Sequence, residues 1–352
     1  MTSRRCSASR SRSSRAAALL CAAALEGCAA TPSPPLVPID GPVAVAAGAR
    51  EFFLFDRDKV ELRGADGVAQ TLAAPAGAGA PAAVSVDLER GWACVACRGA
   101  LAIVQLADRQ VTWATAPLAE PPLALAVSGD LAAVLSRTSV AVHRLPGGEL
   151  LWRETLAPWL KQFRLDEARC VLPLSEQEFL LVGARSMRFN SNSEIVVQKI
   201  DRSQGQWRVV QQTSVPGLTF LHACASDGHA LYLAGVHEEM RTGPMGARGQ
   251  GGALLMTFVI VGVDPATMNA REIVWDERHA HRVLARQLAV GKDLVAVRHE
   301  GGELEIYRLV GEGRSGAPMY EGNFGPSFSA AWLSPNDVVV VGAGEPRIVR
   351  VQ

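Results

Sequence analysis

Short apolar runs separated by polar turns recur along this chain at an interval of about forty residues. The pattern of Val43–Leu72 returns without gaps at Val84–Trp113, 41 residues further on, and a second step of that size leads to Leu125. Leu125–Leu135 and Leu288–Arg298 show the start of a unit most clearly, as an apolar stretch, a polar turn and a second apolar stretch. A repeat of this length indicates an architecture built by stacking similar units.

A third segment of the units alternates between β-forming and other residues at period two. Val140–Leu145 and Leu304–Leu309 are the clearest examples, and this alternation is typical of a half-buried strand. Each unit is therefore predicted to hold four strands, and the units begin near residues 43, 84, 125, 168, 222, 288 and 329. We predict an all-β fold, a seven-bladed β-propeller over residues 43–352, with insertions in the fourth and fifth blades.

The two ends of the repeat region predict how the ring closes. The last unit ends early, at Ile348–Val351, whereas Leu36–Ile39 is a lone extended segment ahead of the first unit. We expect Leu36–Ile39 to form the outermost strand of the last blade, which closes the ring and removes an exposed edge. Pro38 is compatible with this position because an edge strand need not donate every backbone hydrogen bond.

Residues 1–27 have the pattern of a signal peptide. Ala16–Leu25 is an apolar run of ten residues after an arginine-rich start, and this is half the length of a membrane span. The run ends in Leu25-Glu26-Gly27-Cys28, which resembles the lipobox of bacterial lipoproteins, although Glu26 departs from the small or apolar residue preferred there. The resemblance implies that Cys28 is lipidated. Ordinary cleavage near Ala30, which would release a soluble periplasmic protein, stays open as the alternative.

Residues 28–42 are predicted to be a tether between the lipid and the propeller. Five of the twelve residues from Thr31 to Pro42 are prolines, which stiffen a chain into extended geometry. Neither Ala29 nor Ala30 is the aspartate that retains enterobacterial lipoproteins in the inner membrane. The resemblance therefore points to the outer membrane, with the propeller facing the periplasm and the lipid as its sole membrane attachment.

Composition excludes two classes of protein. Hydrophobic residues make up 48% of the chain and charged residues 20%, which is too apolar for an intrinsically disordered protein. The 35 basic residues are balanced by 35 acidic ones, and five of the arginines lie within the predicted signal peptide. Because nucleic-acid binding depends on neutralising phosphates, a mildly acidic mature chain without a basic stripe indicates no nucleic-acid partner.

Several units end in tryptophan, at Trp113, Trp152 and Trp275, with Trp207 as a looser match. We expect these rings to wedge between neighbouring blades. Pro146–Trp152 resembles the repeat of the quinoprotein-like (PQQ-type) propellers, and Phe328–Val340 resembles WD-repeat and TolB-type propellers. These resemblances imply the fold without choosing between the families. The quinoprotein dehydrogenases carry a vicinal cysteine pair that this sequence lacks, so we expect no quinone or other cofactor.

Two cysteine pairs are candidates for chemistry. Cys94 and Cys97 have the spacing of a redox or metal motif, but the repeat places them on a strand, where residues three apart point to opposite faces. We expect both to be core residues. Cys170 and Cys224 lie in adjacent units near their inner strands and could form a disulfide in an oxidising compartment.

Histidines gather in the fifth and sixth units. His237, His279 and His281 are the candidate ligands of a zinc or copper site, set against the interpretation that they are solvated loop residues. Residues 242–252 are rich in glycine but lack the Gly-Lys-Ser/Thr ending of a phosphate loop, so they are expected to form a surface loop. The chain has neither a Gly-x-Ser-x-Gly nor a His-Glu-x-x-His motif, and no catalytic residue is assigned.

The function that these patterns favour is a protein-binding scaffold in the cell envelope. A propeller is a rigid ring whose two faces are made of loops, which suits it for display. The layout resembles the BamB-type lipoproteins of outer-membrane β-barrel assembly, by analogy only, since that family has eight blades. The expected partners are envelope proteins, and the expected state is a monomer. Two alternatives stay open: an enzyme or ligand sensor with a polar cluster at one mouth of the central funnel, and a structural envelope protein.

Overall fold

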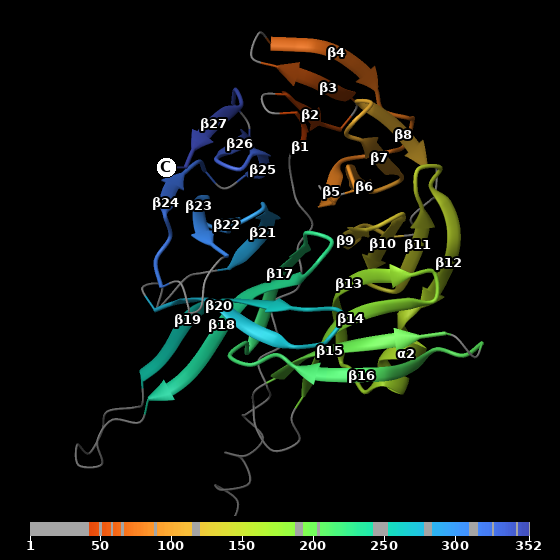
Figure 1. Cartoon of the computed structure of the whole chain (residues 1–352), viewed down its shortest axis with the longest axis vertical. Coiled ribbons are helices and arrows are strands. Elements are labelled where there is room, and N and C mark those ends of the chain that lie inside the picture. Colours follow the sequence, from red (N-terminus) through yellow and green to blue (C-terminus); the bar gives the residue numbers. More distant parts are fainter. Residues whose placement is uncertain are drawn as a thin grey trace, which may run out of the picture.

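The computed structural model describes residues 42–48, 51–57, 59–64, 67–87, 90–114, 120–186, 193–202, 205–241, 253–277, 284–309, 316–325, 327–342 and 344–351. These residues form seven antiparallel sheets arranged in a ring, with each sheet running outward from the centre as one blade (Figure 1). The predicted seven-bladed β-propeller is therefore confirmed. The predicted signal peptide, Cys28, the tether and Leu36–Ile39 lie outside the described residues.

The strands follow one another outward within each blade, and blades 1 to 6 have four strands. The strands of blades 1 to 3 are β1 (Val43–Gly48), β2 (Glu51–Phe55), β3 (Lys59–Gly64), β4 (Gly67–Ala73), β5 (Pro81–Asp87), β6 (Trp92–Cys97), β7 (Leu101–Gln105), β8 (Gln110–Ala114), β9 (Pro122–Ser128), β10 (Leu131–Ser136), β11 (Ser139–Arg144) and β12 (Glu149–Thr155).

Blade 7 has three strands within the described residues. The strands of blades 4 to 7 are β13 (Glu167–Ser175), β14 (Glu178–Ser186), β15 (Ser193–Asp201), β16 (Arg208–Ser214), β17 (Phe220–Ser226), β18 (Leu231–Arg241), β19 (Ala253–Val263), β20 (Ala270–Asp276), β21 (Ala285–Val290), β22 (Leu294–His299), β23 (Glu303–Arg308), β24 (Tyr320–Asn323), β25 (Phe328–Ser334), β26 (Asp337–Gly342) and β27 (Arg347–Arg350).

Each blade buries its apolar faces against its two neighbours. The described residues form seven hydrophobic clusters, one for each pair of adjacent blades. We call the interface between two adjacent blades a seam. Inner and middle strands such as β10 are buried along their whole length, whereas the outer strands β4 and β16 are mostly exposed. Stability in such a ring therefore comes from contacts between neighbouring sheets, because a single four-stranded sheet cannot hide both of its faces.

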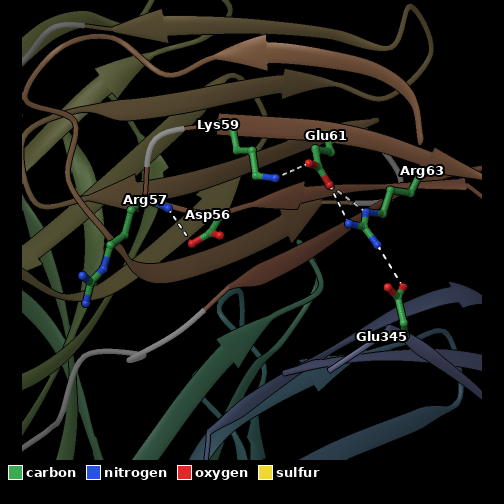
Figure 2. A network of polar contacts seen from close by, with 6 residues as sticks. All are labelled: Asp56, Arg57, Lys59, Glu61, Arg63 and Glu345. Atoms are coloured by element: carbon green, nitrogen blue, oxygen red, sulfur yellow. Dashed lines mark hydrogen bonds and ion pairs between the residues drawn. The ribbon is translucent and has the colours of Figure 1, made fainter. Parts of the chain in front are cut away.

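The ring closes where blade 7 meets blade 1. Ala44, Ala46 and Phe52 of blade 1 pack against apolar residues of β25 and β26, and Ser329 Oγ donates a hydrogen bond to the carbonyl oxygen of Pro42 at 2.8 Å. Polar contacts add to this seam, as Figure 2 shows: Glu61 binds both Lys59 and Arg63, and Arg63 reaches Glu345 of blade 7 at 3.5 Å. Apolar packing and the Arg63–Glu345 ion pair therefore connect the first and last blades.

The two predicted insertions are lengthened hairpins. In blade 4, β14 and β15 have nine residues each, and in blade 5, β18 and β19 have eleven. Residues 237–241 of β18 pair with residues 253–257 of β19, beyond the ends of their pairing with β17 and β20. Blade 5 therefore carries a two-stranded ribbon that extends away from the ring (Figure 1).

One helix was not predicted. α2 (Leu156–Phe163) connects blade 3 to blade 4 and buries Leu156, Trp159 and Phe163, which lie on one face at helical spacing. Gln198 Nε2 donates a hydrogen bond to the carbonyl oxygen of Phe163 at 2.9 Å, which holds the end of the helix against blade 4. Among the described residues, no helix has the length and apolar character needed to cross a bilayer.

The tryptophans at the ends of the repeat units wedge between blades, as predicted. Trp113 of β8 meets Phe55 of blade 1 edge to face, with ring centroids 6.3 Å apart. Trp152 of β12 packs on Phe179 and Trp207 of blade 4, at 5.5 and 4.8 Å. Trp275 of β20 packs against the cluster between blades 4 and 5. Large aromatic rings thus fill the wider, outer part of several seams.

Candidate functional site

The central channel is narrow and apolar along most of its length. Its wall is made of small side chains from the inner strands, among them Ala44, Val84, Ala225, Ala289 and Ala330, and the space between them is about 50 Å³. Small-molecule sites usually enclose about 300–1,000 Å³. The middle of the channel therefore has room for water at most.

The mouth at the start of the inner strands is also small. A cavity of about 60 Å³ is lined there by residues including His222, Cys224, Arg286 and Gln287. Arg286 forms an ion pair with Glu300, and Gln287 exchanges hydrogen bonds with the backbone of Ala330 in the next blade. These polar groups serve contacts between and within blades, and little space remains for a ligand.

The opposite mouth is a polar hollow of about 610 Å³, which we call the polar mouth. It is made by the turns between the first two strands of blades 2, 3, 4 and 5, together with the turn between β11 and β12. Its lining residues are Asp87, Arg90, Ser128, Gly129, Asp130, Leu131, Arg144, Leu145, Leu174, Ser175, Glu176, Gly228 and His229. The structure therefore brings together, from four consecutive blades, polar groups that are far apart in the sequence.

Asp87 lies at the base of the polar mouth and is 2% exposed. Its Oδ1 accepts a hydrogen bond from the backbone N–H of Arg90 at 3.0 Å, and its Oδ2 accepts one from Gly129 N–H of blade 3 at 3.1 Å. Gly228 of blade 5 approaches the same carboxylate: a Cβ at Gly228, where φ is +90°, would lie 3.1 Å from Asp87 Oδ2. Glycine is required at this turn for both its backbone conformation and its close approach.

Ion pairs fix the side of the polar mouth formed by blades 3 and 4. Arg144 pairs with Glu149 at 3.0 Å and with Glu176 of blade 4 at 2.5 Å. The hydrogen bond and the charge of Glu176 raise the pKa of the Arg144 guanidinium, so it stays charged. Trp152 Nε1 donates a hydrogen bond to the carbonyl oxygen of Glu176 at 3.0 Å. The turn that carries Glu176 is thus bound to blade 3 through both its side chain and its backbone.

Asp227 organises the turn of blade 5. Its Oδ1 accepts hydrogen bonds from the backbone N–H groups of His229 and Ala230, both at 2.8 Å, and its Oδ2 accepts one from the Tyr232 hydroxyl at 2.8 Å. Burial raises the pKa of Tyr232, which keeps the hydroxyl protonated as the donor. This turn therefore presents Gly228 and His229 to the polar mouth in a fixed geometry.

Two charged side chains of the polar mouth are available to a partner. Within the described parts of the chain, the carboxylate of Asp130 and the guanidinium of Arg90 make no hydrogen bond or ion pair, and both residues are exposed. Exposed charges at a binding surface speed the encounter with an oppositely charged partner and help to select that partner. The polar mouth thus combines a rigid base with free charges at its rim.

Those candidate residues of the sequence that the structure describes lie outside the polar mouth. The His237 ring packs on Trp275, with centroids 5.0 Å apart. His279 and His281 lie outside the described residues, and among those described no three His, Cys, Asp or Glu side chains gather to hold a metal ion. Cys170 of β13 and Cys224 of β17 are joined by a disulfide.

Cys94 and Cys97 are free and buried in β6. Cys94 belongs to the cluster between blades 2 and 3 and Cys97 to the one between blades 1 and 2, as expected for opposite faces of one sheet. Burial raises the pKa of Cys94 and raises that of Cys97 to about 12, so both are protonated and unreactive.

A buried polar cluster between blades 5 and 6 was also missed from the sequence. His299 Nε2 lies 2.7 Å from Glu305 Oε2, and the Tyr307 hydroxyl lies 2.6 Å from the same oxygen and 3.2 Å from Asp276 Oδ2. All four residues are at most 4% exposed, and none of them lines the cavities described above. The cluster ties β20 to β22 and β23, a contact between blades.

The sequence does contain a signal for the polar mouth. An acidic residue recurs in or beside the turn between the first two strands of successive units, at Asp87, Asp130, Glu176, Asp227, Asp293 and Asp337. In the first three units of this series the acidic residue lines the polar mouth. The repeat could therefore have located these turns at one end of the ring.

Comparison with known proteins supports the fold. No family model and no curated protein matches the sequence. The β-propeller domain of Myceliophteria thermophila Cps50 (Swd1) aligns over 89% of this chain and 97% of its own, with a TM-score of 0.58 and 12% identity. The computationally designed Ika8 protein aligns over 90% and 99%, with a TM-score of 0.51 and 12% identity. At such identity the likeness shows the fold alone, and the chain is a seven-bladed β-propeller.

Proposed function

We propose that the protein is a scaffold of the cell envelope, held by a lipid on Cys28, and that a partner protein docks on the polar mouth. One observation carries the proposal: the hollow of about 610 Å³ is built from the turns of four blades above a channel with almost no free space. Its turns are held by internal hydrogen bonds, and a rigid surface loses little conformational entropy when it binds.

Two features support the envelope location. The apolar run Ala16–Leu25 and the lipobox-like residues before Cys28 favour export and lipidation. The disulfide between Cys170 and Cys224 suits an oxidising compartment such as the periplasm, because disulfides are rare in the reducing cytosol. Labelling with a radioactive fatty acid tests the anchor: Cys28→Ser should abolish incorporation and move the protein out of the membrane fraction. Equal labelling of the Ser variant would contradict it.

A photo-crosslinking amino acid tests the docking surface. Placed at Asp130, which is exposed and unpaired at the rim, it should give a discrete adduct when the full chain is irradiated in its own cells. The matched control is Arg57, an exposed residue in the turn between β2 and β3, which lies on the opposite face of the ring because successive turns of a blade alternate between faces. Failure to form an adduct at position 130, or identical adducts at both positions, would refute docking at the polar mouth.

A ligand sensor is the second candidate, because the polar mouth provides the polar cluster at one end of the channel that this function requires. Its volume also lies within the range of small-molecule sites. The two functions are separated by the size of the bound species: native mass spectrometry of the purified protein should show a retained small molecule for a sensor. Retention of only a protein partner would favour the scaffold.

A further inference from the structure

The base of the polar mouth carries a negative charge that no cation of the described residues neutralises. Asp87 is 2% exposed, and its two oxygens accept one backbone hydrogen bond each. A carboxylate has about four lone-pair positions, so each oxygen keeps acceptor capacity. Asp87 forms no ion pair with any described residue, although a buried charge is normally paired because it has lost its hydration.

The other charges around the hollow do not change this picture. Arg144 is neutralised by Glu149 and Glu176, so this group of three has a net negative charge. Arg90 is exposed, where water screens its charge, and Asp130 adds a second free carboxylate at the rim. An ion pair made at a desolvated position is stronger than one made in water. The buried Asp87 therefore has more to gain from a ligand charge than the exposed Arg90.

We propose that the polar mouth accepts a basic side chain, an arginine or lysine of the partner, with Asp87 at its base as the anchor. This inference rests on the proposed docking surface and adds the chemistry of the docked segment. A long cationic side chain suits the hollow because its methylenes can lie against Leu131, Leu145 and Leu174, which are part of the lining. The charged end then reaches the base of the hollow.

The test uses the purified full chain and a fluorescein-labelled peptide of Gly, Ser and one central Arg. The matched probe replaces that Arg by citrulline, which keeps the shape and removes the charge, and a third peptide carries Lys. Fluorescence anisotropy should show the Arg or the Lys peptide binding at least tenfold more tightly than the citrulline peptide. Equal affinity of all three peptides would overturn the proposal.

Two variants locate the contact. Asp87→Asn keeps an acceptor for Gly129 N–H and removes the charge, and it should abolish the difference between the charged and citrulline peptides. Asp56→Asn, an exposed aspartate in the β2–β3 turn, is the control and should bind like wild type. An Asp87→Asn protein that still discriminates tenfold would overturn the proposal. If this variant does not fold, the Gly129 amide resonance of the wild type must shift with the charged peptide and stay in place with citrulline.

The outcomes also separate the two proposals. An adduct at position 130 together with no preference for the charged peptide leaves the docking surface intact and refutes the basic side chain. A clear charge preference together with no protein adduct refutes the scaffold and leaves a site for a cationic ligand.

Discussion

The disulfide between Cys170 and Cys224 allows a quantitative prediction. It links the inner strands of blades 4 and 5, and the two cysteines are 54 residues apart in sequence. In the chain-entropy description, closing a loop of that size lowers the entropy of the unfolded chain enough to stabilise the fold by about 4 kcal/mol at 25 °C. Replacing both cysteines by alanine should therefore lower the free energy of unfolding by about 4 kcal/mol.

Equilibrium unfolding in guanidinium chloride measures this difference. Because removing either cysteine opens the cross-link, Cys170→Ala alone should cost nearly as much as the double variant. Wild type in the presence of a reductant should unfold at the denaturant concentration of the double variant. Cys94→Ala serves as the control, since this thiol is free and buried in another seam, and its cost should be unaffected by reductant.

Either of two results would contradict this role of the disulfide. The first is found by alkylating the unfolded, unreduced protein and mapping the label by peptide mass spectrometry. Cys170 and Cys224 should stay unlabelled, and labelling of these residues would mean that the disulfide does not form. Additive losses for the two single alanine variants would mean that packing, and not the cross-link, supplies the stability.

Three further predictions follow from the seams. Gly148→Ala should lower the free energy of unfolding by about 2–4 kcal/mol, from overpacking and from a left-handed backbone. The new Cβ would lie 2.2 Å from Ala114 Cβ, at a φ of +72°. Ala114→Gly in the same chain should restore part of the lost stability, and thermal unfolding that shows no restoration would refute the clash. Hydrogen bonds from Lys59 and Arg63 lower the pKa of Glu61. Its stabilising contribution is therefore complete above the unfolded pKa of about 4.3 and is lost as pH falls through the lower folded value. The difference in unfolding free energy between wild type and Glu61→Gln should shrink below that pH, and a constant difference would contradict this. Amide exchange in β27 should be slower in the full chain than in a chain lacking residues 1–40 if Leu36–Ile39 pairs with that strand, and equal rates would refute the predicted closure.

The repeat was predictable because its signal is local. The seven predicted unit starts lie within three residues of the observed starts of β1, β5, β9, β13, β17, β21 and β25. Alternating apolar residues and polar turns report directly on strands and hairpins, and each blade contains this pattern within one short segment. The residues buried in the seams could be predicted from the same repeat, because an apolar residue on either face of a blade has only a neighbouring blade to pack against.

The helix and the polar mouth were harder to predict for different reasons. α2 has only eight residues, and Leu156, Trp159 and Phe163 can also be read as the end of a strand followed by a loop. The polar mouth is assembled from turns that look ordinary one at a time. Asp87 becomes a special residue only when Gly129 and Gly228, 42 and 141 positions away in the chain, are known to approach it.

The ribbon of blade 5 has a consequence for how the protein tolerates damage. Residues 237–241 and 253–257 pair only with each other among the described strands, so a break within this overhang removes no contact between neighbouring sheets. A proteolytic nick there would divide the polypeptide into two pieces that remain associated, because the rest of β18 and β19 still holds them side by side. The molecule is thus a natural candidate for splitting into complementary fragments that reassemble into one ring.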